Sequence, residues 1–352
     1  MLLLLALSCA YVSYRLRVHP STDLSEWQVW CHSFQQQLLE PIALLDLADW
    51  EKNVLATLTL GYRQQLEWTV RERFSLAGAA HILAVSGFHV GVIYSFLRLC
   101  LFPLSDKSGL RFLKNGLLLM GIWLFAAITG LAASAVRAAW MLSLYLIGIT
   151  IRKKRDSYNT WCAAAFCMLV YNPFYLFDIG FQLSFLAVLS IFFFYRRISS
   201  LLQLRNPLIR APWDWLSISL AAQIGTFPLC LYYFGELSSV SLLAALPVSF
   251  FSILIIPLAF IWIICVCLGW ICAPLCWLIS LIVETFCLFV DRMGRIDPIT
   301  PAEPLSACML FELYLALLFF CLYIREKYFR HLWATFLFFF LFSASMLIER
   351  IS

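Results

Sequence analysis

The sequence is poor in charged residues. Only 13% of its 352 residues are Asp, Glu, Lys or Arg, about half the share that is typical of a soluble domain. Hydrophobic residues make up 63%. Because so few charged side chains cannot cover a water-facing surface of this size, the composition excludes an ordinary soluble globular protein.

Several motifs of catalysis and energy coupling are also missing. The sequence has no Walker-type glycine-rich loop, no His-Glu-x-x-His motif and no loop long enough for a cytoplasmic nucleotide-binding domain. Most of the 13 cysteines lie inside apolar runs, where Cys behaves as a small hydrophobic residue. We therefore expect no ATP hydrolysis by the chain itself, no cofactor and no metal site.

What the sequence has in abundance is apolar runs of about 18 to 25 residues, the length that crosses some 30 Å of hydrocarbon as a helix. Alternating polarity, the signature of a transmembrane β-strand, is absent. The runs beyond residue 77 are 78–104, 112–131, 133–151, 158–176, 178–195, 214–234, 237–273, 275–290, 307–324 and 331–348. The predicted fold class is an all-α polytopic membrane protein with about ten or eleven transmembrane helices.

The run over 237–273 is too long for one straight span and contains Pro247 and Pro257. Proline removes a helical hydrogen bond and clashes with the preceding turn. We therefore predict a broken or re-entrant segment here.

Three regions are predicted along the chain. Residues 1–14 form a short first membrane helix, 15–75 an amphipathic helical segment outside the cytoplasm, and 76–348 the transmembrane domain. Within the second region, Trp27, Trp30, Phe34 and Leu38 recur at helical spacing. This stripe fits a helix in the membrane interface, or equally a helix packed on the outer ends of the bundle.

Positive charge gathers in alternate loops. Fourteen Lys and Arg residues lie between 107 and 114, 152 and 155, 196 and 210, and 325 and 330, whereas the intervening short loops and the C-terminal tail hold only Arg292, Arg295 and Arg350. By the positive-inside rule, the fourteen are cytoplasmic. The segment 15–75 and the C-terminus then lie outside the cytoplasm, with 237–273 counted as one net crossing.

The first cluster of polar groups within an apolar run spans residues 81–91. It contains His81, Ser86, Gly87, His89 and Gly91. Polar residues in a span are costly and are candidates for function. The two glycines also suit close helix packing, and a Ser86–His89 hydrolase pair is disfavoured because no third group nearby orients the imidazole.

A second cluster pairs Ser134 and Arg137, three residues apart on one helix face. Arg137 lies about a turn and a half from the outer end of its run, so its alternatives are lining a polar path and snorkelling to the interface.

The third cluster places Asp178 and Gln182 on one face, with Ser184 close by and Phe181 and Phe185 on another face. The aromatic rings are either core residues or surfaces for base stacking. A separate acid, Glu284, lies near the middle of its run and requires protonation or a partner. Arg137, a histidine and Gln223 are the partners open to it.

The first three clusters, read in order, resemble the ComEC family of competence proteins. The matching residues are Leu60-Gly61, Ala77-Gly78, His81, Leu83-Ala84, Ser86-Gly87, His89-Val90-Gly91, Thr129-Gly130, Ser134 to Ala138, Asn172-Pro173 and Phe177 to Phe185. The resemblance covers roughly 50–325. Many members of that family add an OB-like domain and a metallo-β-lactamase-like domain, and this sequence shows neither a strand-rich run in its first 60 residues nor a His-x-His-x-Asp-His motif.

The resemblance implies a channel, not an enzyme, that passes single-stranded DNA through the bacterial cytoplasmic membrane during natural transformation. It implies an extracytoplasmic DNA-receptor protein and a cytoplasmic ATP-driven translocase as partners, and leaves a homo-oligomer open. The candidates for the DNA path are His81, Ser86, Gly87, His89, Ser134, Arg137, Asp178, Phe181, Gln182, Ser184 and Glu284. The alternative is a small-solute secondary transporter, in which Glu284 and the histidines form a proton relay.

Overall fold

The computed structural model describes residues 33–79, 82–104, 108–151, 156–237, 241–295, 300–301 and 305–351. These residues are almost entirely helical. Two strands of two residues each, β1 (Glu236–Leu237) and β2 (Thr300–Pro301), pair antiparallel. The all-α prediction is thus confirmed, whereas the short helix predicted over 1–14 lies outside the described residues.

Eight of the described helices are long and apolar enough to cross a membrane, and the chain is a multi-pass membrane protein. They are α7 (Ser108–Ile128), α8 (Ala133–Thr150), α10 (Ile179–Ser199), α11 (Pro207–Phe234), α12 (Ser241–Cys267), α13 (Ala273–Gly294), α14 (Ala307–Glu326) and α15 (Phe329–Ile351).

Two of the ten predicted spans are shorter than expected. In its described part, the run 78–104 contains the 14-residue helix α6 (Gly87–Cys100) as its one α-helix. The run 158–176 contains the 15-residue helix α9 (Ser157–Tyr171) and the 3-10 turn η2 (Pro173–Phe177). At 1.5 Å per residue each helix is only about 20 Å long. Pro173 ends α9, because the residue before a proline is driven to an extended conformation, here Asn172 with ψ of 104°.

The break predicted over 237–273 is wrong, because α12 is one helix of 27 residues that runs through Pro247 and Pro257. The helix packs against α4 (Asp49–Leu60), α6, α11 and α13, and these neighbours keep it continuous through both prolines. The interruption lies instead before α6. There α5 (Trp68–Leu76) ends, Gly78 takes a φ of 68°, and an irregular loop leads to Gly87.

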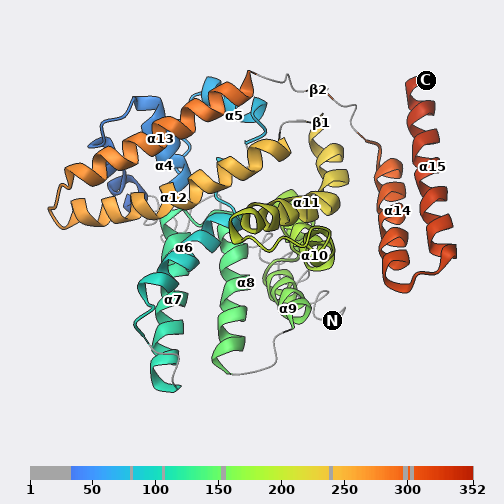
Figure 1. Ribbon diagram of the computed structural model, residues 1–352, viewed down its shortest axis with the longest axis horizontal. Coiled ribbons are helices and arrows are strands. Elements are labelled where there is room, and N and C mark those ends of the chain that lie inside the picture. Colours follow the sequence, from blue (N-terminus) through green and yellow to red (C-terminus); the bar gives the residue numbers. More distant parts are fainter. Residues whose placement is uncertain are drawn as a thin grey trace, which may run out of the picture.

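Helices α12 and α13 lie side by side across the upper part of Figure 1, above α6, α7 and α8. On their other side are α3 (Leu39–Ala43), α4 and α5, which share a buried apolar core with them. In this core the fully buried Trp262 of α12 donates its indole N–H to the Pro41 carbonyl at 2.7 Å.

The described part of the predicted amphipathic stripe joins the same core. Leu38 is buried and Phe34 packs against its neighbours, whereas Trp27 and Trp30 lie outside the described residues. For this part of the stripe, packing against the bundle is the alternative that holds.

Helices α10 and α11 form one of the two most extensive helix pairs in the described chain. Glycine at 225 makes their approach possible, because a Cβ atom at that position would overlap the Ser190 hydroxyl. Tyr314 of α14 donates its hydroxyl to the Gly225 carbonyl at 3.1 Å. Through this contact α11 connects the core to the α14–α15 hairpin, which stands apart in Figure 1.

We expect Gly225→Val to lower the stability of the detergent-solubilised protein by about 1–3 kcal/mol, because overpacking forces α10 and α11 apart. The matched control is Gly148→Val, also within a helix, where an added Cβ meets nothing within 4 Å. Both variants carry the same propensity penalty, so thermal unfolding followed by size-exclusion chromatography isolates the packing effect. Equal melting temperatures for the two variants would contradict this account of the helix crossing.

Candidate functional site

The irregular loop over residues 82–86 brings the first sequence cluster into the centre of the structure. Ser86 is the N-cap of α6, and its hydroxyl lies 2.9 Å from Nδ1 of His89. The Ser86 backbone N–H also donates to this Nδ1, at 3.3 Å. His89 is completely buried, and its ring therefore caps the start of the helix from within. His81 lies outside the described residues.

The end of α4 presses against this loop. Gly61 follows α4 with a φ of 72°, and a Cβ atom there would lie 2.8 Å from the Val85 side chain and 3.4 Å from Cβ of Thr129. Only glycine combines this backbone conformation with so close an approach. The Leu60-Gly61 step, the loop and the turn after α7 therefore meet at one point.

Two side chains donate hydrogen bonds to the carbonyls of the loop. Arg63 donates its Nε–H to the Leu83 carbonyl at 3.1 Å, and the Ser134 hydroxyl at the start of α8 donates to the Val85 carbonyl. Partial burial lowers the pKa of Arg63 from its ordinary value, with Arg71 as the smaller cause, but a guanidinium stays charged at neutral pH. A carbonyl in apolar surroundings needs such a partner, so these two residues stabilise the interrupted segment.

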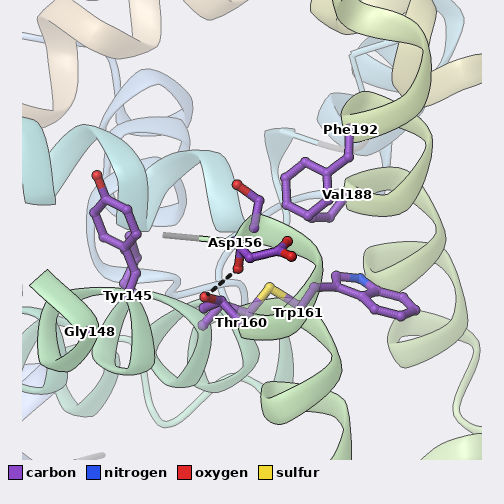
Figure 2. A pocket seen from close by; sticks show the side chains of 10 residues that line it. Tyr145, Gly148, Asp156, Thr160, Trp161, Val188 and Phe192 are labelled. Atoms are coloured by element: carbon purple, nitrogen blue, oxygen red, sulfur yellow. Dashed lines mark hydrogen bonds between the residues drawn. The ribbon is translucent and has the colours of Figure 1, made fainter. Parts of the chain in front are cut away.

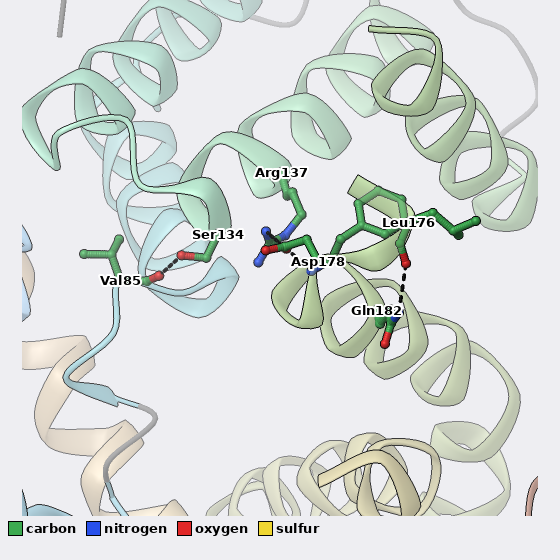
Figure 3. A network of polar contacts seen from close by, with 7 residues as sticks. Val85, Ser134, Arg137, Leu176, Asp178 and Gln182 are labelled. Atoms are coloured by element: carbon green, nitrogen blue, oxygen red, sulfur yellow. Dashed lines mark hydrogen bonds and ion pairs between the residues drawn. The ribbon is translucent and has the colours of Figure 1, made fainter. Parts of the chain in front are cut away.

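Arg137 does not snorkel, and its partner is not Glu284. Its Nη1 lies 3.3 Å from the Asp178 carboxylate at the start of α10. Figure 3 shows the guanidinium directed at Asp178, while Ser134 on the same helix is directed at Val85. The Arg137 side chain is 7% exposed and that of Asp178 is 45% exposed. The ion pair therefore joins a buried guanidinium to a carboxylate that is about half exposed.

The residues after Asp178 complete this contact. The Asp178 carboxylate also accepts the Phe181 backbone N–H at 2.6 Å, which makes it the N-cap of α10. A Cβ atom at Gly180 would lie 2.8 Å from Nη2 of Arg137, so the absence of a side chain there leaves room for the guanidinium. Asp178 thus has two structural roles, and its charge neutralises Arg137.

The aromatic residues of the third cluster are core residues. Phe181 and Phe185 are buried, with ring centroids 4.3 Å apart, and Tyr175 and Trp161 pack against them. Their faces are therefore not available for stacking on a base.

The polar members of the same cluster are only partly buried. Gln182 donates to the Leu176 carbonyl at 2.8 Å (Figure 3). It also accepts a hydrogen bond from the Tyr233 hydroxyl at 3.0 Å. Ser184, two residues further along α10, is also partly buried. Both residues lie on α10, and neither contributes to the two cavities beside α6 described next.

Glu284 stands apart from the other candidates. It is exposed on α13 and forms no ion pair with any residue that the structure describes. The intramembrane pair that the sequence left open between Glu284 and Arg137 is therefore not formed, because Asp178 occupies the guanidinium.

A cavity of about 460 Å³ lies between α8, α9 and α10, and Figure 2 shows its wall. Asp156, Ser157 and Thr160 at the start of α9 supply polar groups to it, as do the Tyr145 hydroxyl and the Trp161 indole. None of the residues singled out from the sequence lines this cavity.

Two further cavities are lined in part by residues of α6 or of the loop before it. One, of about 260 Å³, lies where the 82–88 segment meets α11 and α12, and its wall consists of Ile82, Ser86, Phe88, Trp215, Ile218, Ser219, Ala245, Leu246 and Ser249. The other, of about 560 Å³, lies between α6 and α12 and shares Phe88 with the first. Of the predicted path residues only Ser86 lines the first cavity.

Trp215, Ser219 and Ser249 are not among the residues predicted from the sequence, because none of them belongs to the three clusters of polar groups. The available signal was the spacing of Trp215 and Ser219, four residues apart on one face of an apolar run. Within the residues that the structure describes, no group of three or more His, Cys, Asp or Glu side chains could hold a metal ion.

Comparison with known proteins gives one family and one curated relative. Residues 58–327 match the family model described as "Competence protein". The chain is 32% identical over 228 residues to ComE operon protein 3 of Bacillus subtilis (strain 168), an alignment covering 64% of this chain and 27% of that relative. The chain thus spans well under half of the relative's length. No solved structure matches it.

If Asp178 neutralises Arg137, Asp178→Asn should lower stability by about 1–3 kcal/mol. This is less than for a fully buried pair, because the acid is half exposed. Asparagine can still cap α10, so the change removes the charge alone. Adding Arg137→Met should restore the melting temperature, since no unpaired charge then remains.

The control for this experiment is Asp214→Asn. Asp214 pairs with Arg210 at 3.5 Å on the exposed start of α11, where removal of one partner should cost less than about 1 kcal/mol. Equal losses from the two Asn variants, measured by thermal unfolding in detergent, would show that the Arg137 pair is not a buried one.

Proposed function

The chain belongs to the competence protein family, and from this premise we propose that it passes single-stranded DNA across the bacterial cytoplasmic membrane during natural transformation. The observation that carries the proposal is the cavity where the irregular 82–88 segment meets α11 and α12. Non-helical backbone within a membrane protein is tolerated where it is buried in protein or lines a hydrated cavity. Loop 82–86 meets that condition beside three serine side chains.

The local geometry favours a passage over a catalytic centre, and we propose that the chain is not an enzyme. The distance between the Ser86 hydroxyl and His89 is that of a nucleophile and its general base, but the contact caps the start of α6. Arg137, the charged candidate from the sequence, is neutralised by Asp178. Uncharged hydroxyls and aromatic rings remain as the groups that face the cavity.

The partners follow from the energetics of the transported strand. Inward movement of an anion opposes an inside-negative potential, at about 2.3 kcal/mol per charge per 100 mV. A passage by itself cannot supply this work. We therefore propose an extracytoplasmic receptor that delivers the strand and a cytoplasmic ATP-driven translocase that pulls it, with self-association of the chain as an option compatible with the widely exposed apolar α14–α15 hairpin.

The alternative of a secondary transporter has less support. A proton relay needs titratable groups in hydrogen-bond reach of one another. Glu284 is exposed on α13. In the described part of the chain, it forms no ion pair and no hydrogen bond with a histidine. Among the residues that the structure describes, which exclude His81, this alternative therefore has no connected path.

The proposed function predicts that Gly61→Ala abolishes most DNA internalisation and leaves DNA binding at the cell surface intact. A side chain at 61 would displace Val85 and with it the loop that lines the cavity. The assay measures nuclease-resistant and nuclease-sensitive labelled DNA in a deletion strain that carries this sequence in place of its own gene. Unimpaired internalisation in the uncomplemented deletion strain would refute the function.

Gly269→Ala is the matched control. Gly269 has a φ of 78°, similar to that of Gly61, but an added Cβ meets nothing within 4 Å. Both changes therefore carry the same backbone strain, of the order of 1 kcal/mol. Immunoblots of the membrane fraction should show comparable levels, and only Gly61→Ala should lose uptake.

For orientation, we propose an extracytoplasmic C-terminus, on the basis of the fourteen-to-three distribution of Lys and Arg. Reporter fusions after Ser352 and within residues 20–70 should read as extracytoplasmic, and fusions at Lys107, Lys153 and Arg205 as cytoplasmic. A cytoplasmic C-terminus would show that one span has been miscounted, because this topology requires an even number of crossings after residue 75.

A further inference from the structure

We propose that the cavity between α6, α11 and α12 is a subsite for one unpaired base of the DNA strand, which stacks on Phe88 and Trp215. This inference rests on the proposed function and specifies which part of the nucleotide the site receives. It concerns residues from three elements that are far apart in the sequence: the start of α6, the first half of α11 and the first half of α12.

The cavity exists because α12 packs against both α6 and α11. The space that remains between them has a volume of about 260 Å³. Most of its wall is apolar, and its polar groups are the side chains of Ser86, Ser219 and Ser249. A mostly apolar pocket with a few polar groups is suited to a flat, partly polar ligand such as a nucleobase.

The protons of two of these hydroxyls are already engaged. The Ser249 hydroxyl donates to the Ala245 carbonyl at 2.6 Å, and the Ser86 hydroxyl lies 2.9 Å from Nδ1 of His89. Because the Ser86 backbone N–H donates to the same Nδ1, this nitrogen is an acceptor and the hydroxyl is the donor in that contact. Each of these oxygens therefore presents lone pairs to the cavity.

The lining residues include oxygen lone pairs but no cation, and this determines whether the base or the phosphate of a nucleotide fits the cavity. A phosphate carries a charge and binds best to cations, whereas the donors left in this wall, the Trp215 indole N–H and the Ser219 hydroxyl, are neutral and suit the carbonyl oxygens of a base. The N–H groups of a base are donors and match the acceptor oxygens of Ser86 and Ser249. The wall of the cavity thus favours the base, and the phosphates remain in the more hydrated space outside it.

The two aromatic rings of the cavity are available for stacking, in contrast to Phe181 and Phe185. Phe88 is 37% exposed and makes one edge-on contact with His89, at a centroid distance of 6.0 Å. Trp215 is partly buried and makes no ring contact and no hydrogen bond with any described residue. Stacking on a ring does not distinguish one base from another, so the subsite accepts any sequence.

Phe88 also lines the adjoining cavity between α6 and α12, where Gly91 and Ser95 leave space of about 560 Å³. A Cβ atom at Gly91 would meet nothing within 4 Å, so this space extends to the backbone of α6. A base that leaves the first cavity past Phe88 therefore enters a second one. The pair of cavities suits movement of the strand one base at a time.

The test compares two oligodeoxynucleotides, an oligodeoxythymidine and the same strand with abasic sites, bound to the full chain in lipid nanodiscs. We expect the protein to bind the intact strand about tenfold more tightly, because the abasic strand has no bases to stack. Trp215→Ala should bind both strands equally, and Trp215→Tyr should keep most of the preference. Trp277→Ala, at a 66% exposed position on α13, is the matched control and should behave as the unmodified chain.

A second measurement does not depend on any variant. A strand that carries 5-bromodeoxyuridine, irradiated on the unmodified chain, should crosslink to Trp215 or Phe88, as mapped by mass spectrometry. Crosslinks only at other residues, or equal affinity of the unmodified chain for the two strands, would overturn the subsite and leave the proposed function standing. Failure to bind either strand, together with normal transformation in the deletion strain, would instead overturn the proposed function.

Discussion

The structure depends on how the backbone of residues 82–86 is satisfied in apolar surroundings. An unpaired carbonyl or N–H away from water is costly, and a helix is the simplest way to avoid the cost. Here the helix is interrupted, and three side chains supply the partners: Arg63 for the Leu83 carbonyl, Ser134 for that of Val85, and His89 for the N–H of Ser86. The segment after α4, the start of α8 and the start of α6 are therefore held together at this loop.

The need to pair the polar groups of this region also explains why glycine occupies two positions. Gly61 allows α4 to reach Val85 and Thr129, and Gly180 leaves the space in which Arg137 meets Asp178. A larger residue at either position would push away the partner that the polar groups need. Close backbone approach and polar satisfaction are thus two aspects of one arrangement, in which small residues permit the hydrogen bonds and the ion pair that larger ones would prevent.

This arrangement also separates structural from accessible groups. The charged or titratable candidates in the first three clusters that the structure describes are Arg137, Asp178 and His89, and each forms an ion pair or a helix cap. None of these three residues lines the cavity between α6, α11 and α12, whose mostly apolar wall contains two aromatic rings and three hydroxyls. A strand of DNA needs a path that neither traps its phosphates nor prefers one sequence, and weak acceptors with stacking surfaces meet both conditions better than a fixed charge.

The sequence by itself determined the helical, membrane-spanning class, because the length and polarity of a run are local properties and the thickness of the hydrocarbon core sets the length that a spanning helix needs. It also placed the helix starts at Asp178 and Ser306, where a short polar side chain accepts a backbone N–H of the first turn of its own helix. The tertiary structure decided the rest. Neighbouring helices keep α12 continuous through two prolines, and Asp178, 41 residues away, is the acid that reaches Arg137. The cavity likewise depends on how α6 and α11 are placed against α12, and such placements between distant segments leave no local pattern in the sequence.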